Sequence, residues 1–128
     1  MGEWKQIETT ASRIQKALAI TGMKQSDLVE ATGLNKSTVS RYLSGQIEPK
    51  QKATGLLARA LGVDEMWLWG YDVPMERSKN AKKNDAIVDV VTKLRKDSDF
   101  FDVVSMLAEL PAEQYASIKQ LVSALRNK

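Results

Sequence analysis

Apolar side chains in the first half of the chain recur every three or four residues, in short runs that are separated by glycines. This spacing places apolar groups on one face of a helix, and no stretch alternates residue by residue as a half-buried strand does. The pattern therefore predicts five short helices, over residues 10–20, 25–32, 35–43, 49–61 and 64–69. Together they predict a small all-α domain over residues 9–71.

Residues of the capping type stand at the ends of these predicted helices. Thr10, Asn35 and Asp64 carry oxygens that accept hydrogen bonds from first-turn N–H groups, so they are expected to be N-caps. Pro49 is expected to open the fourth helix, because its fixed φ suits a first turn. Glycine is common where a helix ends in left-handed backbone. The glycines that follow the five predicted helices are Gly22, Gly33, Gly45, Gly62 and Gly70.

Residues 72–84 contain Pro74 and then a polar, basic run that is almost free of apolar side chains. This composition predicts a linker after the helical domain. The alternative is that its basic cluster contacts DNA. Residues 1–8 are expected to form an N-terminal extension, and no role is predicted for them.

Helical periodicity returns in residues 85–128. One helix is predicted around 87–94, a second is expected to be capped by Ser98 or Asp99, and a third to be opened by Pro111. The whole chain is therefore expected to be all-α, with a five-helix domain, a linker and a small helical region.

The C-terminal region is expected to mediate oligomerisation. About 44 residues in two or three short helices cannot bury much of their own apolar surface. Packing against a second copy solves this problem and predicts a homodimer or a larger homo-oligomer. The alternative is that the region packs back on the first domain. The residues expected at the oligomer interface are Val91, Leu94, Phe100, Val104, Leu107, Tyr115, Ile118, Leu121 and Leu125.

The amino-acid composition argues against an enzyme. The chain has no cysteine and no histidine, which excludes disulfides, thiolate metal sites and a Ser-His-Asp triad. No cluster of metal ligands, phosphate-binding glycine loop or nucleophile–base pair appears, so no metal and no cofactor is expected. No apolar run approaches the roughly 20 residues that span a bilayer, and the start lacks a secretion signal. A cytoplasmic binding protein is the resulting expectation.

Positive charge is concentrated in the first half of the chain. Residues 9–62 hold eight basic and three acidic side chains, whereas the rest of the chain holds 11 basic and 13 acidic ones. Such an excess is expected of a domain that meets a polyanion. A solvated surface with a chance asymmetry of charge would give the same counts.

The segment 25–45 carries the pattern with the clearest functional meaning. Gly33 stands where the chain turns sharply between two predicted helices, and Leu34 is expected beneath that turn. The residues expected to face the domain interior are Leu28, Val29, Val39, Tyr42 and Leu43. The residues left facing outward are Lys36, Ser37, Ser40 and Arg41. All four are polar or basic, as a helix that enters the major groove of DNA requires.

The span from Thr9 to Gly70 resembles the helix-turn-helix domain of temperate-phage repressors and of the wider Cro/repressor-like regulators of the xenobiotic-response-element type. The residues that carry the resemblance are Gln25, Gly33, Val39, Tyr42, Gly45 and Pro49, followed by the ending at 61–68. Val29 departs from the family, which usually has alanine there, and is expected to widen the helix crossing slightly. The resemblance implies a transcriptional repressor that binds inverted-repeat operators in double-stranded DNA as a dimer.

The resemblance also implies roles for individual side chains. Base readout would fall to Lys36, Ser37, Ser40 and Arg41, with Arg41 contacting O6 and N7 of guanine. Contacts to the DNA backbone would fall to Gln25, Thr38, Gln46, Lys50 and Gln51. Plain solvation explains each polar residue taken singly. Their shared place within one motif favours contact with DNA.

Many phage-type repressors carry a self-cleaving protease domain with a Ser-Lys pair. The 44 residues after the predicted linker are too few and too helical for such a domain. A short repressor, or a truncated piece of a longer one, is therefore expected, and induction by self-cleavage is not. Release from DNA would then need another agent, such as a small antirepressor protein.

The alternative function is that of an antitoxin-like module. Such a module would neutralise a partner protein through its C-terminal helices. The side chains that could supply this surface are Phe100, Phe101, Tyr115 and Ile118.

Overall fold

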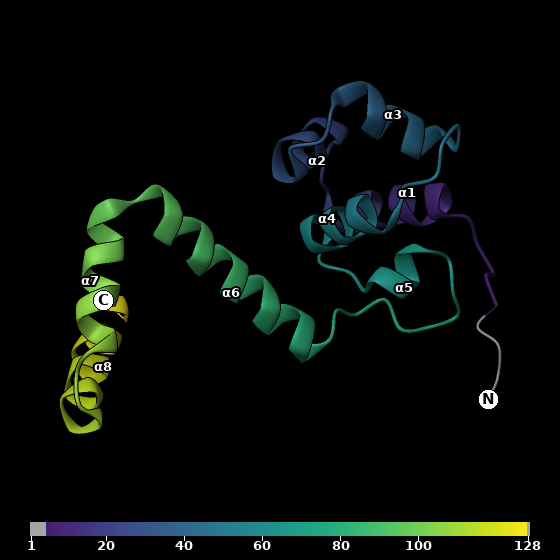
Figure 1. The fold of residues 1–128 in the computed structure, drawn as a ribbon. Coiled ribbons are helices and arrows are strands. Elements are labelled where there is room, and N and C mark those ends of the chain that lie inside the picture. Colours follow the sequence, from purple (N-terminus) through teal and green to yellow (C-terminus); the bar gives the residue numbers. More distant parts are fainter. Residues whose placement is uncertain (1–4, 128) are drawn as a thin grey trace. The chain divides into compact units, whose positions relative to one another are not determined.

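The computed structural model describes residues 5–127, which form eight α-helices and two isolated β-bridges (Figure 1). The prediction of an all-α fold is confirmed. Residues 1–4 of the predicted N-terminal extension, and Lys128, lie outside the described residues. The helices are α1 (Thr10–Thr21), α2 (Gln25–Thr32), α3 (Lys36–Ser44), α4 (Gln51–Leu61), α5 (Glu65–Leu68), α6 (Lys79–Lys96), α7 (Ser98–Ala108) and α8 (Ala112–Arg126).

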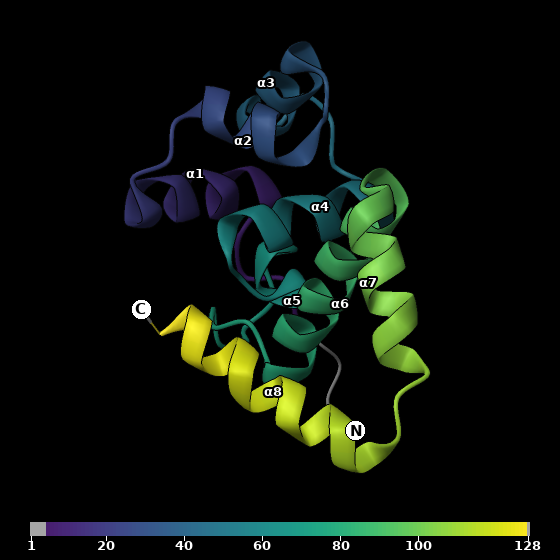
Figure 2. The same cartoon turned by 90° about the vertical axis from the view of Figure 1, so that its left-hand side faces the viewer.

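The chain divides into two compact units, Met1–Lys83 and Asn84–Lys128. In the first unit, α2 and α3 lie on one side of α1 and α4, and α5 lies on the other side (Figures 1 and 2). All five helices contribute to one apolar core. Its buried members are Ile14, Ala17, Leu28, Val39, Tyr42, Leu57, Ala58, Leu61, Val63, Trp67 and Leu68.

Caps observed in the first unit agree with the predicted helix ends at most positions. Asn35 Oδ1 accepts a hydrogen bond from Ser37 N at 2.9 Å, and Asp64 Oδ1 accepts one from Met66 N at 2.9 Å. The five glycines predicted to end helices all have positive φ, between 70° and 95°. Left-handed backbone of this kind costs other residues energy, so glycine suits these five turns.

Two predicted helix starts are corrected by the structure. Thr9, not Thr10, caps α1, because Thr9 Oγ1 accepts from Ser12 N at 3.1 Å while Thr10 is itself buried. The N-cap of α4 is Lys50, and Pro49 lies one residue further back and is buried. Both shifts are one or two residues, which is the usual uncertainty of helix ends.

The structure differs from the predicted linker at residues 72–84. Val73 and Met75 pack against the core, and the Met75 carbonyl accepts a hydrogen bond from Asp64 N at 3.0 Å. Arg77 is buried and donates from Nη1 to the Val63 carbonyl at 3.1 Å. From Lys79 onward the chain is already helix α6. Polar composition misled the prediction, because lysine and alanine are good helix formers and Arg77 finds its partners by tertiary contact.

The second unit consists of most of α6 with α7 and α8. Asp97 caps α7, since its Oδ1 accepts from Phe100 N at 3.0 Å, so neither Ser98 nor Asp99 is the cap. Pro111 precedes α8 as its N-cap residue. None of the described residues from 84 to 127 is buried. This unit therefore leaves its apolar side chains largely accessible.

No helix within residues 5–127 combines the length and the apolar character needed to cross a membrane.

Candidate nucleic-acid interface

Helix α3 has one polar, exposed face and one apolar, inward face. Lys36, Ser37, Ser40 and Arg41 are all exposed. Their spacing along the helix puts them on one side, and no acidic residue occurs in α3. On the opposite side, Val39 is fully buried, Tyr42 is buried, and Leu43 packs partly buried against the core. The helix is therefore anchored by one side and free to contact a partner with the other.

Neighbouring elements fix the position of α3. Gly33, with φ of 70°, makes the turn from α2, and Gly45, with φ of 81°, ends the helix. Gln15 of α1 reaches across and donates from Nε2 to the Leu43 carbonyl at 2.6 Å. The two turns and this hydrogen bond thus set where α3 begins, where it ends and how it lies against α1.

The Ser37 hydroxyl is already engaged with the helix cap. It donates to Asn35 Oδ1 at 2.8 Å, beside the hydrogen bond from its own backbone N–H. A hydroxyl has one donor and two lone pairs, so in this arrangement Ser37 can only accept further hydrogen bonds. Amino groups of adenine or cytosine are donors in the major groove, and they are the base groups that suit Ser37.

The five residues predicted to contact the DNA backbone lie at helix starts, on α3 and in the loop after α3. Gln25 is the first residue of α2 and Thr38 lies on α3, and both are partly buried. Gln46, Lys50 and Gln51 are exposed. Lys50 is the N-cap of α4 but makes no side-chain cap hydrogen bond, and the first turn of α4 has no acidic residue. The amides of this turn therefore suit an anion such as a phosphate.

Arg13 is buried in the first unit, so the count of basic residues available to a polyanion must be corrected. Its side chain is 3% exposed, and its Nε lies 2.9 Å from Glu8 Oε1. Nη1 donates to the Trp67 carbonyl at 3.1 Å. Arg13 is thus one of the eight basic residues counted in the first half, yet it does not face a polyanion.

Glu8 gathers three side chains of α1 around its carboxylate. Lys16 Nζ donates to Glu8 Oε1 at 2.8 Å, and Ser12 Oγ donates to Oε2 at 2.9 Å. The hydrogen bond from Lys16 is the main cause that holds the pKa of the Glu8 carboxyl below its ordinary value. The hydrogen bond from Ser12 and the charge of Arg13 act in the same direction. The positive charge of Lys16 is thus paired with the Glu8 carboxylate. The exposed basic residues of α3 and of the start of α4 are Lys36, Arg41, Lys50 and Lys52.

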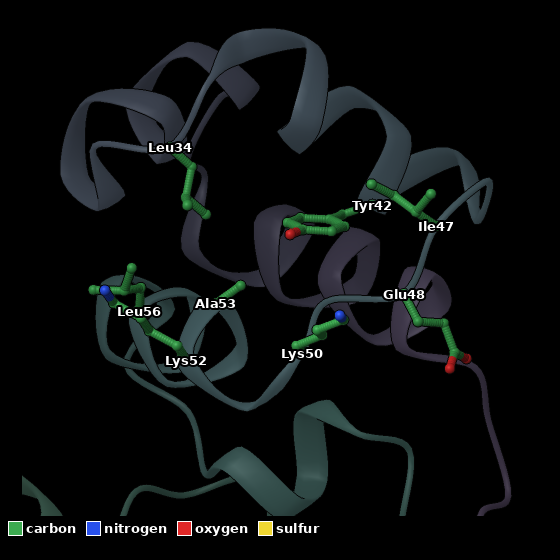
Figure 3. A pocket seen from close by; sticks show the side chains of 8 residues that line it. All are labelled: Leu34, Tyr42, Ile47, Glu48, Lys50, Lys52, Ala53 and Leu56. Carbon is green, nitrogen blue, oxygen red and sulfur yellow. The ribbon is translucent and has the colours of Figure 1, made fainter.

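A groove of about 690 Å³ lies between α3 and the first half of α4 (Figure 3). Leu34 and Tyr42 face it from above and Ala53 from below, so Leu34 lines the groove under the turn, where it was predicted to lie. Lys50 and Lys52 lie on its α4 side, and the Glu48 carboxylate points away from the apolar side chains. The groove separates the inner side of α3 from the start of α4, the two elements that carry predicted DNA contacts.

Most of the first unit matches a known protein family. The helix-turn-helix family model matches residues 10–68, which extend from α1 to α5. These residues form a helix-turn-helix domain. In this helix-turn-helix domain, α2 and α3 are the paired helices.

A curated relative is similar to part of this chain. The chain is 35% identical over 72 residues to the HTH-type transcriptional regulator PrtR of Pseudomonas aeruginosa. The match covers 56% of this chain and 28% of the relative, so the chain spans well under half of that protein. The similarity therefore concerns only part of each protein.

The predicted oligomerisation residues all lie in the second unit. Some of them are exposed: Val91, Tyr115, Leu121 and Leu125. The others are partly buried: Leu94, Phe100, Val104, Leu107 and Ile118. A smaller groove of about 310 Å³ runs between α7 and α8 and is lined mainly by Leu107, Tyr115, Ile118 and Val122, with Lys119 and Arg126. The second unit thus presents exposed apolar side chains and one groove lined by apolar and basic ones.

Within residues 5–127, His, Cys, Asp and Glu side chains form no group of three or more that could hold a metal ion.

Proposed function

We propose that the protein is a sequence-specific transcriptional repressor of the phage type, which binds double-stranded DNA operators with α3 in the major groove. The observation that carries this proposal is the exposed face of α3 within a helix-turn-helix domain, because it combines four polar or basic side chains and no acid. Lys36, Ser37, Ser40 and Arg41 read base edges, and Arg41 donates two hydrogen bonds to guanine O6 and N7.

Contacts to the DNA backbone orient this readout. Gln25 and Thr38 would contact phosphates on one side of α3, and Gln46, Lys50 and Gln51 would do so on the other. The start of α4 supports this assignment, since its first turn lacks both an acidic residue and a side-chain cap. Such contacts position the domain without reading sequence.

Dimerisation through the second unit provides the affinity that one small domain lacks. The unit exposes many apolar side chains. A second copy of the same chain is always present in solution, and most soluble oligomers are homo-oligomers, so a second copy is the proposed partner. Two linked domains bind an inverted repeat with a gain in effective concentration. Half-site centres would be about 34 Å apart or a multiple of that distance.

The two parts of the chain have different proposed roles. Residues 9–71 bind the operator, and residues 85–128 hold two copies together, in the cytoplasm of a bacterial cell. Repression is steric, because the dimer occupies a promoter, and the protein has no catalytic role and needs no cofactor. A small antirepressor protein that binds near residues 72–84 or the terminal helices would release it.

Selection of binding sites from random duplex DNA tests the proposal, followed by mass measurement of the complex in solution. We expect enrichment of an inverted repeat and a complex that contains two protein chains per site. Failure to discriminate between random duplexes at moderate ionic strength would contradict the proposal.

An antitoxin-like function is the second candidate, and the exposed aromatic side chains of the second unit favour it. Phe101 is 54% and Tyr115 is 51% exposed, which leaves both available to a partner protein. Co-purification of the chain with the product of a neighbouring gene, with loss of that product's toxicity, would support this candidate. A homodimer that buries both aromatic residues would contradict it.

A further inference from the structure

The Trp69 side chain connects the end of α5 to the start of α4. Its indole Nε1 donates to Thr54 Oγ1 at 2.8 Å. Thr54 is fully buried, and its hydroxyl lies 2.9 Å from the Lys50 carbonyl and 3.3 Å from the Pro49 carbonyl. The Thr54 hydroxyl therefore accepts from Trp69 and donates its one proton toward the two residues that precede α4.

The backbone around Trp69 is itself held in place by the N-terminal segment. Gln6 Nε2 donates to the Trp69 carbonyl at 2.9 Å, and Ile7 N donates to the Gly70 carbonyl at 2.7 Å. Gly70 has φ of 95°, and a Cβ at this position would lie 1.9 Å from the Glu8 carbonyl oxygen. Only glycine permits this close approach, so the backbone at Trp69 and Gly70 lies directly against the N-terminal segment.

The residues that this connection positions are candidates for contact with phosphate. Lys50 and Gln51 line a depression of about 450 Å³, and its other lining residues are Gln6, Thr10, Glu48, Pro49, Trp69 and Tyr71. Lys50 makes no side-chain cap, so the orientation of its backbone depends on other contacts. The Thr54 hydroxyl supplies one of these contacts from inside the domain.

We infer that Trp69 is a positioning residue for the DNA-backbone contact at the start of α4, acting through Thr54. The inference rests on the proposed DNA-binding function. A phosphate contact depends on the placement of Lys50 and of the first amides of α4, and hydrogen bonds lose strength steeply as their geometry departs from the optimum. Trp69 touches neither the bases nor α3's readout face in this scheme, so its effect is independent of DNA sequence.

Binding measurements on four variants test the inference. Trp69→Phe removes the indole N–H and keeps an aromatic ring, Thr54→Val removes the hydroxyl at nearly constant volume, and Thr54→Ser keeps the hydroxyl. The fourth variant combines Trp69→Phe with Thr54→Val. Each variant and the wild type are titrated, over a range of salt concentrations, with the duplex selected by the wild type and with duplexes that carry single base changes. Urea unfolding gives the folded fraction of each.

The expected result is a loss of affinity of about two- to tenfold for Trp69→Phe and for Thr54→Val, the size of one hydrogen bond. The loss is the same for every duplex, and the slope of log affinity against log salt falls by about 1. Thr54→Ser stays within twofold of the wild type. The double variant is no weaker than Thr54→Val, because both changes interrupt the same connection.

Two results would overturn the inference, and they are distinguishable. If the wild type selects an operator but folded Trp69→Phe and Thr54→Val keep its affinity and salt slope, Trp69 has a purely structural role and the DNA-binding function stands. If the wild type selects no duplex at all, the proposed function fails and the positioning role fails with it.

Discussion

The guanidinium carbon of Arg13 lies 4.6 Å from the centroid of the Trp67 ring, in the interior of the helix-turn-helix domain. The same arginine pairs with Glu8 and donates to the Trp67 carbonyl, so one side chain joins the N-terminal segment, α1 and α5. A planar guanidinium suits this environment, since it stacks on an aromatic face while Nη1 donates to a carbonyl.

Arg13→Ala is therefore expected to destabilise the domain by about 1–3 kcal/mol, because it removes a hydrogen bond to a charged donor and a cation–π contact. Urea unfolding monitored by circular dichroism measures the loss. Lys16→Ala is the matched control, since Lys16 pairs with the same carboxylate but is 49% exposed. An exposed ion pair of this kind contributes little to stability. Equal losses for the two variants would contradict the interior role of Arg13.

Stability is expected to fall in acid because of Glu8. Its pKa is lower in the folded domain than the ordinary value of 4.5, chiefly through the hydrogen bond from Lys16. The unfolded chain therefore takes up the proton first as the pH falls. The contribution of Glu8 is complete well above 4.5 and is lost as the pH falls through the lowered folded-state pKa. We expect Glu8→Gln to be less stable than the wild type at pH 7 and the difference to shrink toward pH 3. A difference that grows in acid would show the opposite sign of linkage.

Substitutions of Arg41 and Lys50 test the proposed base readout and the proposed backbone contact separately. Arg41→Ala should cost about 1–3 kcal/mol of binding and should relax preference at one base position. Lys50→Ala should weaken binding to all sequences alike and lower the salt slope by about 1. Site selection repeated with each variant measures both effects. An unchanged preferred sequence for Arg41→Ala would show that the readout assignment is wrong.

Exposed leucines of α8 should determine the oligomeric state. Leu121 and Leu125 are 60% and 61% exposed, so a charged substitution there leaves little core to disturb. We expect Leu121→Asp to convert the protein to a monomer and to abolish the preference for a full inverted repeat over one half-site, because the linked second domain is lost. Light scattering and binding to one-site and two-site duplexes measure these changes. Gln120→Asp, an equal charge change at the neighbouring position, is the control and should remain dimeric. A monomeric wild type would contradict the prediction.

Most helix ends and helix faces of the first domain could be predicted from the sequence alone. The second helix, its glycine turn and the Asn35 cap are found where the pattern predicts them. The exposure of Lys36, Ser37, Ser40 and Arg41 likewise followed from the apolar positions between them. Periodicity and caps involve residues at most four or five positions apart, so local sequence contains the information they need.

The contacts of Trp69 could not be predicted in this way. Its indole bonds to a residue 15 positions earlier, and its carbonyl accepts from Gln6, 63 positions earlier. The sequence did not explain why both Trp67, within α5, and Trp69, at its C-terminal end, are present. In the structure, Trp67 is buried beneath Arg13, whereas Trp69 reaches the start of α4.

Sequence by itself thus determined that this protein is all helical, where most helices of its first domain begin and end, and which face of α3 is polar. Only the tertiary structure decided that Arg13 is an interior residue, that residues 72–77 pack onto the first unit as more than a linker, and that residues 6–8 bind the turn at Gly70. The physical reason is the range of the interactions. A helix is stabilised by near neighbours along the chain, whereas a buried charge or an extended segment is stabilised by partners that only folding brings within reach.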